Sequence, residues 1–259
     1  MLRSACSAGK TVVIKLFTAT ALITLQQLMK GRKVMMLINS APGERVFVSW
    51  SGGKDSYLSL LRAGEAGLNV VSLLSFIGDD GLSRSHGLKT ALLQKQADAL
   101  GVHLETEAVT WESYEAGFEN AVQRLKKEQA VAGGVFGDIN LEEHQQWVEK
   151  MSLRCGINYN LPLWQMEERA VSEELINRGA RAMLVTIRSD LLDEKWLGRF
   201  LDREYLDYCE EIGISPCGEG GEAHTVVLDG PLFRFPISYS TGIIHRLEQY
   251  ALLELDLKT

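Results

Sequence analysis

The most constraining feature of this sequence is a hexapeptide, Ser51-Gly52-Gly53-Lys54-Asp55-Ser56, placed between two segments of different periodicity. Residues 45–50 (RVFVSW) before it are rich in β-branched and aromatic side chains, which predicts a strand. Residues 55–67 after it carry leucines at helical spacing. A strand, a tight turn and a helix in this order begin a β-α-β unit, so we expect a parallel sheet.

The alternation of strand and helix patterns continues to about residue 164. We predict strands at 69–76, within 102–109 and at 130–136, a short strand that ends at 161–164, and helices at 87–100, 114–129 and 142–154. The near-continuous apolar run at 69–76 is typical of a strand buried on both faces. This pattern predicts an α/β fold with a doubly wound parallel sheet and right-handed crossovers.

After Trp164 the rhythm loosens, which predicts a second, smaller α+β domain. We expect a helix at 168–178, a strand at 181–187, a helix at 194–211 and a strand at 224–228. A glycine-rich turn at 218–221 precedes the last of these, and residues 237–257 suggest a strand with an amphipathic helix, or a hairpin. The predicted divisions are therefore an extension at 1–43, a nucleotide-binding domain at 44–165 and an acceptor domain at 166–259.

The charge distribution and the cysteine content argue against a nucleic-acid partner and against a cysteine-bound metal site. The net charge is −7, but residues 1–43 hold six basic and no acidic residues, so the remainder holds 21 basic and 34 acidic ones, a net of −13. Such an acidic body disfavours nucleic acid as a partner, because binding phosphates needs a basic surface. The four cysteines form no C-x-x-C pair, which indicates free thiols in a reducing cytoplasm rather than a zinc or iron–sulfur site.

The basic N-terminal stretch carries no recognised motif. Residues 11–29 are apolar but are interrupted by Lys15, Gln26 and Gln27, so we expect no membrane span. A transit peptide is one alternative, and a start codon placed upstream of the true one, at Met35 or Met36, is the interpretation we favour. Residues 1–34 are accordingly predicted to be dispensable.

Each residue type in the hexapeptide suits the binding of phosphate groups. Gly52 and Gly53 let backbone N–H groups approach phosphate oxygens, and the following helix directs its positive end to the same place. The hydroxyls of Ser51 and Ser56 and the ammonium of Lys54 add donors, while Asp55 can help to hold Mg²⁺. The alternative without function is an ordinary glycine-rich turn between a strand and a helix. A Walker A loop is excluded, because that motif needs glycine at the position of Val48.

On these residues the sequence resembles the PP-loop ATPases, also called N-type ATP pyrophosphatases. The resemblance implies an adenine-nucleotide α-hydrolase-like sheet and a loop that grips the pyrophosphate part of ATP. It also implies that a nucleophile attacks the α-phosphate, so that the products are AMP and pyrophosphate. We assign Phe76, at the end of the second predicted strand, to the same nucleotide site.

Further motifs make the chain similar to the diphthine–ammonia ligase family over roughly residues 44–235. They are His86 followed by Leu88, Gln94, Ala97, Leu100 and Gly101; Val135-Phe136-Gly137-Asp138-Ile139 with Pro162-Leu163-Trp164; and Cys217-Gly218-Glu219-Gly220-Gly221-Glu222-Ala223-His224-Thr225 with Asp229-Gly230-Pro231-Leu232-Phe233. The resemblance implies an ATP-dependent amide ligase that adenylates a carboxylate acceptor and transfers it to ammonia or another amine donor. It leaves a homodimer open.

The motifs also carry chemistry of their own. Gly137 and Asp138 follow a strand end, where a carboxylate can reach Mg²⁺ or the ribose, although turn aspartates are common. Glu219, Glu222 and His224 suit binding ammonium or taking a proton from an attacking amine, and we expect them to face the α-phosphate across a cleft. The resemblance makes His86 a site residue, and Cys217 is expected to be structural.

The helix after Asp138 departs from the family pattern of the archaeal and eukaryotic members. His144 and Trp147 occupy positions where those members carry Gln and Arg, as in bacterial-type relatives, so the acceptor stays open. A PP-loop tRNA-modifying enzyme and a nucleotide-binding sensor without catalysis are the alternatives. Paired cysteines would favour a thiolase, and a sensor would not need the Glu/His segment at 219–224.

Overall fold

The computed structural model describes residues 37–258, and two β-sheets organise this part of the chain. The first has six strands in the order β1-β6-β5-β2-β3-β4, of which β2 to β6 run parallel and β1 pairs antiparallel with β6. Its strands are β1 (Leu37–Ile38), β2 (Arg45–Ser49), β3 (Asn69–Ile77), β4 (His103–Ala108), β5 (Gly133–Val135) and β6 (Asn158–Leu161). The predicted parallel α/β sheet is confirmed.

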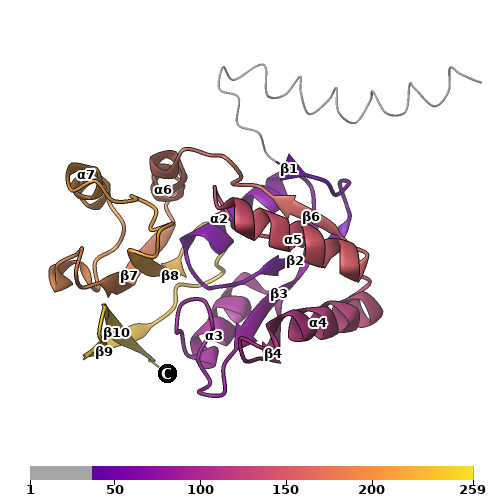
Figure 1. Ribbon diagram of the computed structural model, residues 1–259, viewed down its shortest axis with the longest axis horizontal. Helices are drawn as coiled ribbons and strands as arrows, with labels where there is room; N and C mark the ends of the chain where they lie inside the picture. Colours follow the sequence, from indigo (N-terminus) through magenta and orange to yellow (C-terminus); the bar gives the residue numbers. More distant parts are fainter. Residues whose placement is uncertain (1–36, 259) are drawn as a thin grey trace, which may run out of the picture. The chain divides into compact units, whose positions relative to one another are not determined.

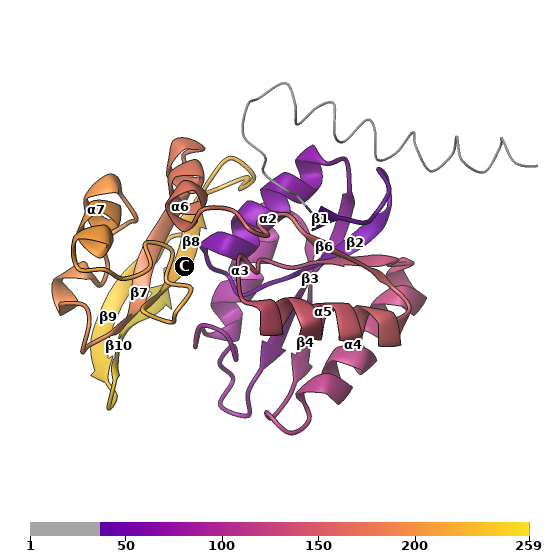
Figure 2. The ribbon, with the colours of Figure 1, turned by 45° about the horizontal axis from the view of Figure 1, so that its top comes forward.

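Four helices cover the first sheet on both faces. They are α2 (Lys54–Glu65), α3 (Thr90–Leu100), α4 (Tyr114–Gln129) and α5 (Glu142–Cys155). Figures 1 and 2 show α4 and α5 together on one face and α2 and α3 on the other. The chain runs outward from β2 to β4 and then returns to β5 beside β2, so the strand order reverses between β2 and β5. Ligands of doubly wound sheets bind at the carboxyl ends of the strands at this reversal.

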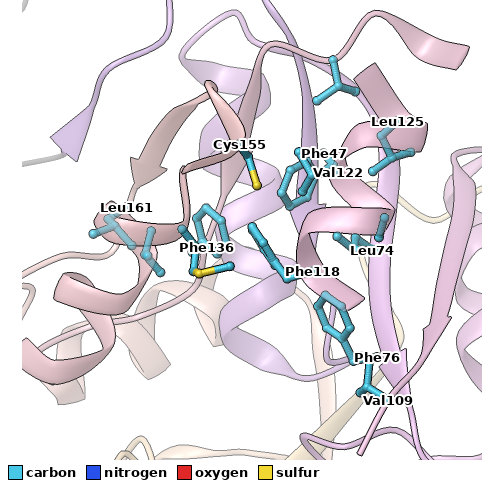
Figure 3. Close-up of a cluster of buried hydrophobic side chains, with 14 of the residues drawn as sticks. Phe47, Leu74, Phe76, Val109, Phe118, Val122, Leu125, Phe136, Cys155 and Leu161 are labelled. Atoms are coloured by element: carbon cyan, nitrogen blue, oxygen red, sulfur yellow. The ribbon is translucent and has the colours of Figure 1, made fainter. Parts of the chain in front are cut away.

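The main apolar cluster lies between the sheet and the α4–α5 pair (Figure 3). Phe47 of β2 makes edge-to-face contacts with Phe118 of α4 and with Phe136, at ring-centroid distances of 6.2 and 5.8 Å. The neighbours of Phe47, Val46 and Val48, are also fully buried, because their side chains point to the opposite face of the sheet. A central strand buried on both faces holds the loop that follows it firmly in place.

The second sheet is antiparallel, with strands in the order β8-β7-β10-β9, as Figure 2 shows. The strands of this sheet are β7 (Arg181–Arg188), β8 (Ala223–Asp229), β9 (Tyr239–Arg246) and β10 (Tyr250–Leu257). The helices in the same part of the chain are α6 (Glu168–Asn177), the short 3₁₀ helix η1 (Glu194–Trp196) and α7 (Arg203–Glu211). Of the two alternatives for the tail, the hairpin is confirmed, since β9 and β10 pair with each other. An antiparallel sheet with helices fits the predicted α+β region.

Some of the predicted element boundaries are wrong. The helix predicted over 194–211 is interrupted: Gly198 adopts a left-handed φ of +79°, and Phe200 forms a bridge with Met183 of β7. The helix resumes only at α7, whose first turn is capped by Asp202. Leucine spacing could not reveal this break, because the bridge partner lies in a distant strand.

The fold also begins before Glu44, the predicted start of the nucleotide-binding domain. Leu37 and Ile38 pair with β6, and the Asn160 side chain accepts hydrogen bonds from the backbone N–H groups of Asn39 and Ser40. A two-residue strand is too short for a periodicity signal. The prediction that residues 1–34 are dispensable concerns a segment outside the described residues. Between residues 37 and 258, no helix is long and apolar enough to cross a membrane.

Candidate active site

The loop Ser51–Ser56 (the PP-loop) lies at the carboxyl end of β2 and leads into the first turn of α2. Gly52 has a φ of +81°, and a Cβ on Gly53 would lie 2.3 Å from the Cε1 atom of His86, so neither position tolerates a side chain without rearrangement. The Gly53 N–H donates to Ser51 Oγ (3.2 Å), and the Ser51 and Ser56 hydroxyls are also 3.2 Å apart. Donors therefore gather at a helix N-terminus, where an anion is favoured.

Lys54 and Asp55 form a buried ion pair at the base of the loop. Lys54 is only 6% exposed, and its Nζ lies 2.6 Å from Asp55 Oδ2. Burial acts to lower the pKa of Lys54, but the attraction of Asp55 outweighs it and the pKa is raised, so the ammonium stays charged. Burial likewise raises the pKa of Asp55, which Lys54 only partly offsets. The other carboxylate oxygen, Asp55 Oδ1, is buried without a hydrogen-bond partner among the described residues.

A cavity of about 310 Å³ opens beside the PP-loop, a volume within the range of small-molecule sites. Its walls come from the PP-loop, from β3 and the segment after it, from the first residue of α4, from the segment after β5, and from residues 217–225 at the start of β8. The residues predicted for the site that line it are Ser51, Lys54, Asp55, Ser56, Phe76, His86, Gly137, Asp138, Glu219 and His224. Gly52 and Gly53 shape the loop without lining the cavity.

Asp138 lies just beyond β5, on the other side of the strand-order reversal from the PP-loop. Its Oδ1 is 3.0 Å from Nδ1 of His144, and this hydrogen bond raises the pKa of the histidine. Asp138 is close enough to Asp55 to add to the rise in the pKa of that carboxyl. Gly137 permits the approach, because a Cβ there would lie 3.1 Å from the Asp55 carbonyl carbon. Two carboxylates thus face the cavity from neighbouring strand ends.

The segment after α7 brings a third carboxyl group to the same cavity. Glu219 Oε1 faces the backbone N–H groups of Ile139 (3.4 Å) and Asn140 (3.5 Å), so the loop closes directly over the end of β5. The Ser215 hydroxyl braces this loop by accepting from the N–H of Glu219 (3.2 Å) and contacting Glu168. Burial, followed by repulsion from Asp55, raises the pKa of Glu219.

Glu222, predicted to share this role, does not line the cavity. Its Oε1 faces the Ser215 N–H (3.5 Å), and its Oε2 is buried without a partner among the described residues. Glu222 directly precedes β8 and its side chain is directed at Ser215, whereas the Glu219 side chain is directed at the backbone that follows β5. The placement of Glu222 does not support the predicted contact with the α-phosphate.

Two histidines from distant parts of the chain stack inside the cavity. The His86 and His224 rings are 4.5 Å apart with an interplanar angle of 14°, and His86 Nδ1 lies 3.1 Å from the Thr225 carbonyl oxygen. Burial lowers the pKa of His224 to about 4, and it lowers that of His86 well below its usual value. Both rings are therefore neutral near pH 7, and His86 must carry its proton on Nδ1 to donate to the carbonyl.

Several cavity residues were not found by sequence reasoning. Arg84 lines the cavity while its Nε donates to the Val109 carbonyl (3.0 Å), and Tyr114 lines it with a pKa raised by burial to about 12. Arg84 lies only two residues before His86, which was the available signal. Cys217 also lines the cavity, and burial raises the pKa of its thiol to about 12, as befits the structural role expected for it.

Comparison with known proteins agrees with this geometry. Family models for the N-terminal and C-terminal domains of diphthamide synthase match residues 44–159 and 167–252. The chain is 29% identical over 234 residues to the diphthine–ammonia ligase of Homo sapiens and 26% identical to that of Rattus norvegicus. Each alignment covers 80% of this chain and 88% of the relative.

Among solved structures, a U34-tRNA thiolase from Methanococcus maripaludis is similar with a TM-score of 0.35 and 15% identity. The match covers 61% of this chain and 63% of that one. A likeness at that score carries no argument about function.

Proposed function

Because the chain belongs to the diphthine–ammonia ligase family, we propose that it is an ATP-dependent carbon–nitrogen ligase. In the first step the carboxylate of an acceptor attacks the α-phosphate of ATP, and pyrophosphate leaves. In the second step ammonia attacks the carbonyl carbon of the acyl-adenylate, AMP leaves, and the amine loses a proton. The single observation that carries this proposal is one cavity lined both by the PP-loop and by Glu219.

The PP-loop supplies the groups that the first step needs. The backbone N–H groups at the start of α2 and the hydroxyls of Ser51 and Ser56 would donate to the phosphates, and Lys54 would stabilise the charge that builds on the leaving pyrophosphate. These groups are fixed before ATP arrives, so little free energy is spent on ordering them. Phe76 and Gly137 line the cavity beside them and would contact the nucleoside part.

Asp55 and Asp138 are suited to hold Mg²⁺. The unpartnered Asp55 Oδ1 is a ligand without another role, and Mg²⁺ in nucleotide sites takes one or two carboxylates while the phosphates complete its shell. When bound, the ion would neutralise part of the phosphate charge near these two acids.

Glu219 is suited to the second step. Its carboxylate would attract ammonium, and its raised pKa makes it a better acceptor for the proton that the attacking amine releases. Because His86 and His224 are neutral, they add no positive charge to that of Lys54 and Arg84, which line the same cavity. The diphthine named in the relatives is one candidate acceptor, and Arg84 is placed to contact an anionic group on it.

The decisive experiment follows the phosphates and the amide separately. The protein is incubated with α-labelled ATP, Mg²⁺, ammonium and a diphthine-bearing peptide, and AMP, ADP and pyrophosphate are resolved by chromatography. We expect AMP and pyrophosphate with one amide formed per AMP. ADP as the main product would refute the mechanism, and nucleotide binding without turnover on any carboxylate acceptor would favour the sensor alternative.

A further inference from the structure

Gln96 of α3 lies next to the PP-loop although it is 45 residues away from it in sequence order. Its side chain is fully buried and forms hydrogen bonds with Trp50, with the PP-loop and with β8. The amide nitrogen donates to the carbonyl oxygens of Gly52 and Val227, both at 2.8 Å, and the amide oxygen accepts from the indole N–H of Trp50 at 2.9 Å. Gln96 thus joins three segments that meet only in the folded chain.

The partners of Gln96 fix the orientation of its amide. The indole nitrogen of Trp50 can only donate, and the two carbonyl oxygens can only accept. A flipped amide would place its oxygen against both carbonyl oxygens and its NH₂ group against the indole N–H. Buried polar groups without partners are costly, so only the observed orientation is stable.

The Gly52 carbonyl that Gln96 holds belongs to the Gly52–Gly53 peptide. This oxygen also accepts from the Val227 N–H at 2.9 Å, so two donors hold it on the side of β8. In a trans peptide the carbonyl and the following N–H point in opposite directions. The Gly53 N–H is therefore held toward Ser51 Oγ, which lines the cavity.

A peptide between two glycines has no side chain to resist rotation, since glycine populates both signs of φ with similar ease. Rotation of this peptide would turn the Gly52 carbonyl oxygen toward Ser51, which lines the cavity, and replace a donor by an acceptor beside it. An oxygen there would repel the phosphates that the loop is proposed to bind. We propose that Gln96 is a positioning residue that locks the Gly52–Gly53 peptide in its anion-binding orientation.

The hydrogen bonds among Gln96, Gly52 and Val227 also connect the C-terminal sheet to the nucleotide site. Val227 of β8 supplies the second donor to Gly52 O and accepts from Gln96, and the Lys54 N–H donates to the Thr225 hydroxyl at 3.1 Å. The binding of ATP then depends on β8 lying against the PP-loop. This inference rests on the proposed function, because it assumes that the PP-loop binds the pyrophosphate part of ATP.

The test compares ATP with AMP, which lacks the pyrophosphate part. Gln96→Met keeps the side-chain volume and removes both donors, whereas Gln96→Glu keeps the acceptor for Trp50 and places an oxygen against the two carbonyls. The matched control is Gln94→Met, since Gln94 is an exposed residue of the same helix that bonds only to Asp98. Dissociation constants for both nucleotides are measured by calorimetry on the full chain.

We expect both Gln96 variants to bind ATP about tenfold more weakly or worse, as the loss of one donor to a charged phosphate implies, while AMP affinity changes less than about twofold. Gln94→Met should match the parent for both nucleotides. If Gln96 had only a structural role, its substitution would weaken the binding of ATP and of AMP equally, and that result would overturn the inference. Unchanged ATP affinity in Gln96→Met would also overturn it. If Gln96→Met does not fold, unchanged ATP affinity in Gln96→Glu would do the same. Failure of the parent to bind ATP would instead refute the proposed function.

Discussion

The two loops that meet at the cavity present opposite chemistry to it. The loop from Ser51 to Ser56 offers backbone N–H groups, hydroxyls and the charged Lys54, all suited to an anion. The segment from Cys217 to Thr225 offers the carboxyl group of Glu219, the neutral ring of His224 and a thiol that stays protonated. A reaction between a polyanion and an amine needs both environments side by side.

The loops also differ in how they are held. The PP-loop continues a central strand that is buried on both faces, and Gln96 and β8 fix its carbonyl groups. The second loop is held by side chains, chiefly the Ser215 hydroxyl and the contacts of Glu219 with the backbone after β5. Under the proposed mechanism, the backbone groups, the hydroxyls and Lys54 of the PP-loop would bind the phosphates, whereas the Glu219 side chain would bind the amine.

The largest expected effect follows from removing Lys54, the one positively charged residue of the PP-loop. Lys54→Ala should reduce pyrophosphate release by at least about 100-fold, because the loss of a group that stabilises transition-state charge costs that much or more. Asp55 would keep the fold by binding a proton, as its raised pKa favours. Pyrophosphate release is measured with a coupled assay, and Lys150→Ala, which removes an exposed lysine, is the control. Equal turnover in Lys54→Ala and the parent would contradict the proposal that the PP-loop stabilises the leaving pyrophosphate.

The next prediction separates two glutamates of the second loop. Glu219→Gln should still exchange labelled pyrophosphate into ATP in the presence of acceptor, but amide formation should fall by about 100-fold, a typical loss for a proton-transfer group. Glu222→Gln should change amide formation far less, because its side chain does not line the cavity. Both variants are assayed for exchange and for amide. A larger loss in Glu222→Gln than in Glu219→Gln would reverse the roles assigned here.

A smaller effect concerns the stacked histidines that join the loops. The pKa of His224 is about 4 in the folded chain and near 6.5 when unfolded, so its contribution to stability is fully present above pH 6.5 and is lost as the pH falls toward 4. His86 acts in the same direction. Each histidine adds at most about 1.4 kcal/mol per pH unit to the slope.

Urea unfolding of the parent and of His224→Gln at pH 7 and pH 5 measures this slope. The free energy of unfolding should fall less between these pH values in the variant, since one buried ring that resists protonation has been removed. The same pH dependence in both proteins would show that the His224 ring is not held in its neutral form by the fold.

The smallest effect on the site is expected from shortening the N-terminus. A chain starting at Met35 should bind ATP as well as the full chain. A chain starting at Glu44 should lose about 1–3 kcal/mol of stability, because β1 and the hydrogen bonds of Asn39 and Ser40 to Asn160 are removed. Calorimetric ATP affinity and urea unfolding check both forms, and equal stability of the two would mean that β1 adds nothing.

Much of the first sheet could be predicted from the sequence because its signals are local. The predicted helix at 114–129 coincides with α4, and Gly101 takes the left-handed φ of +67° expected at the end of α3. The predicted helix at 87–100 began too early, since α3 starts at Thr90 after Lys89. The missed strand β1 and the broken helix at 197–202 depend on partners far away in sequence, which periodicity does not report.

For the site, the sequence by itself determined the phosphate-binding loop, because that chemistry resides in six consecutive residues at one strand–helix junction. It also marked Glu219 and His224, but the choice between Glu219 and Glu222 was made only by the fold, which decides where each side chain points. Tertiary structure alone revealed the contacts of Gln96 and the stacking of His86 on His224. Hydrogen bonds and stacking across more than 40 residues of chain leave no periodic trace, because they depend on how the two sheets pack and not on local spacing.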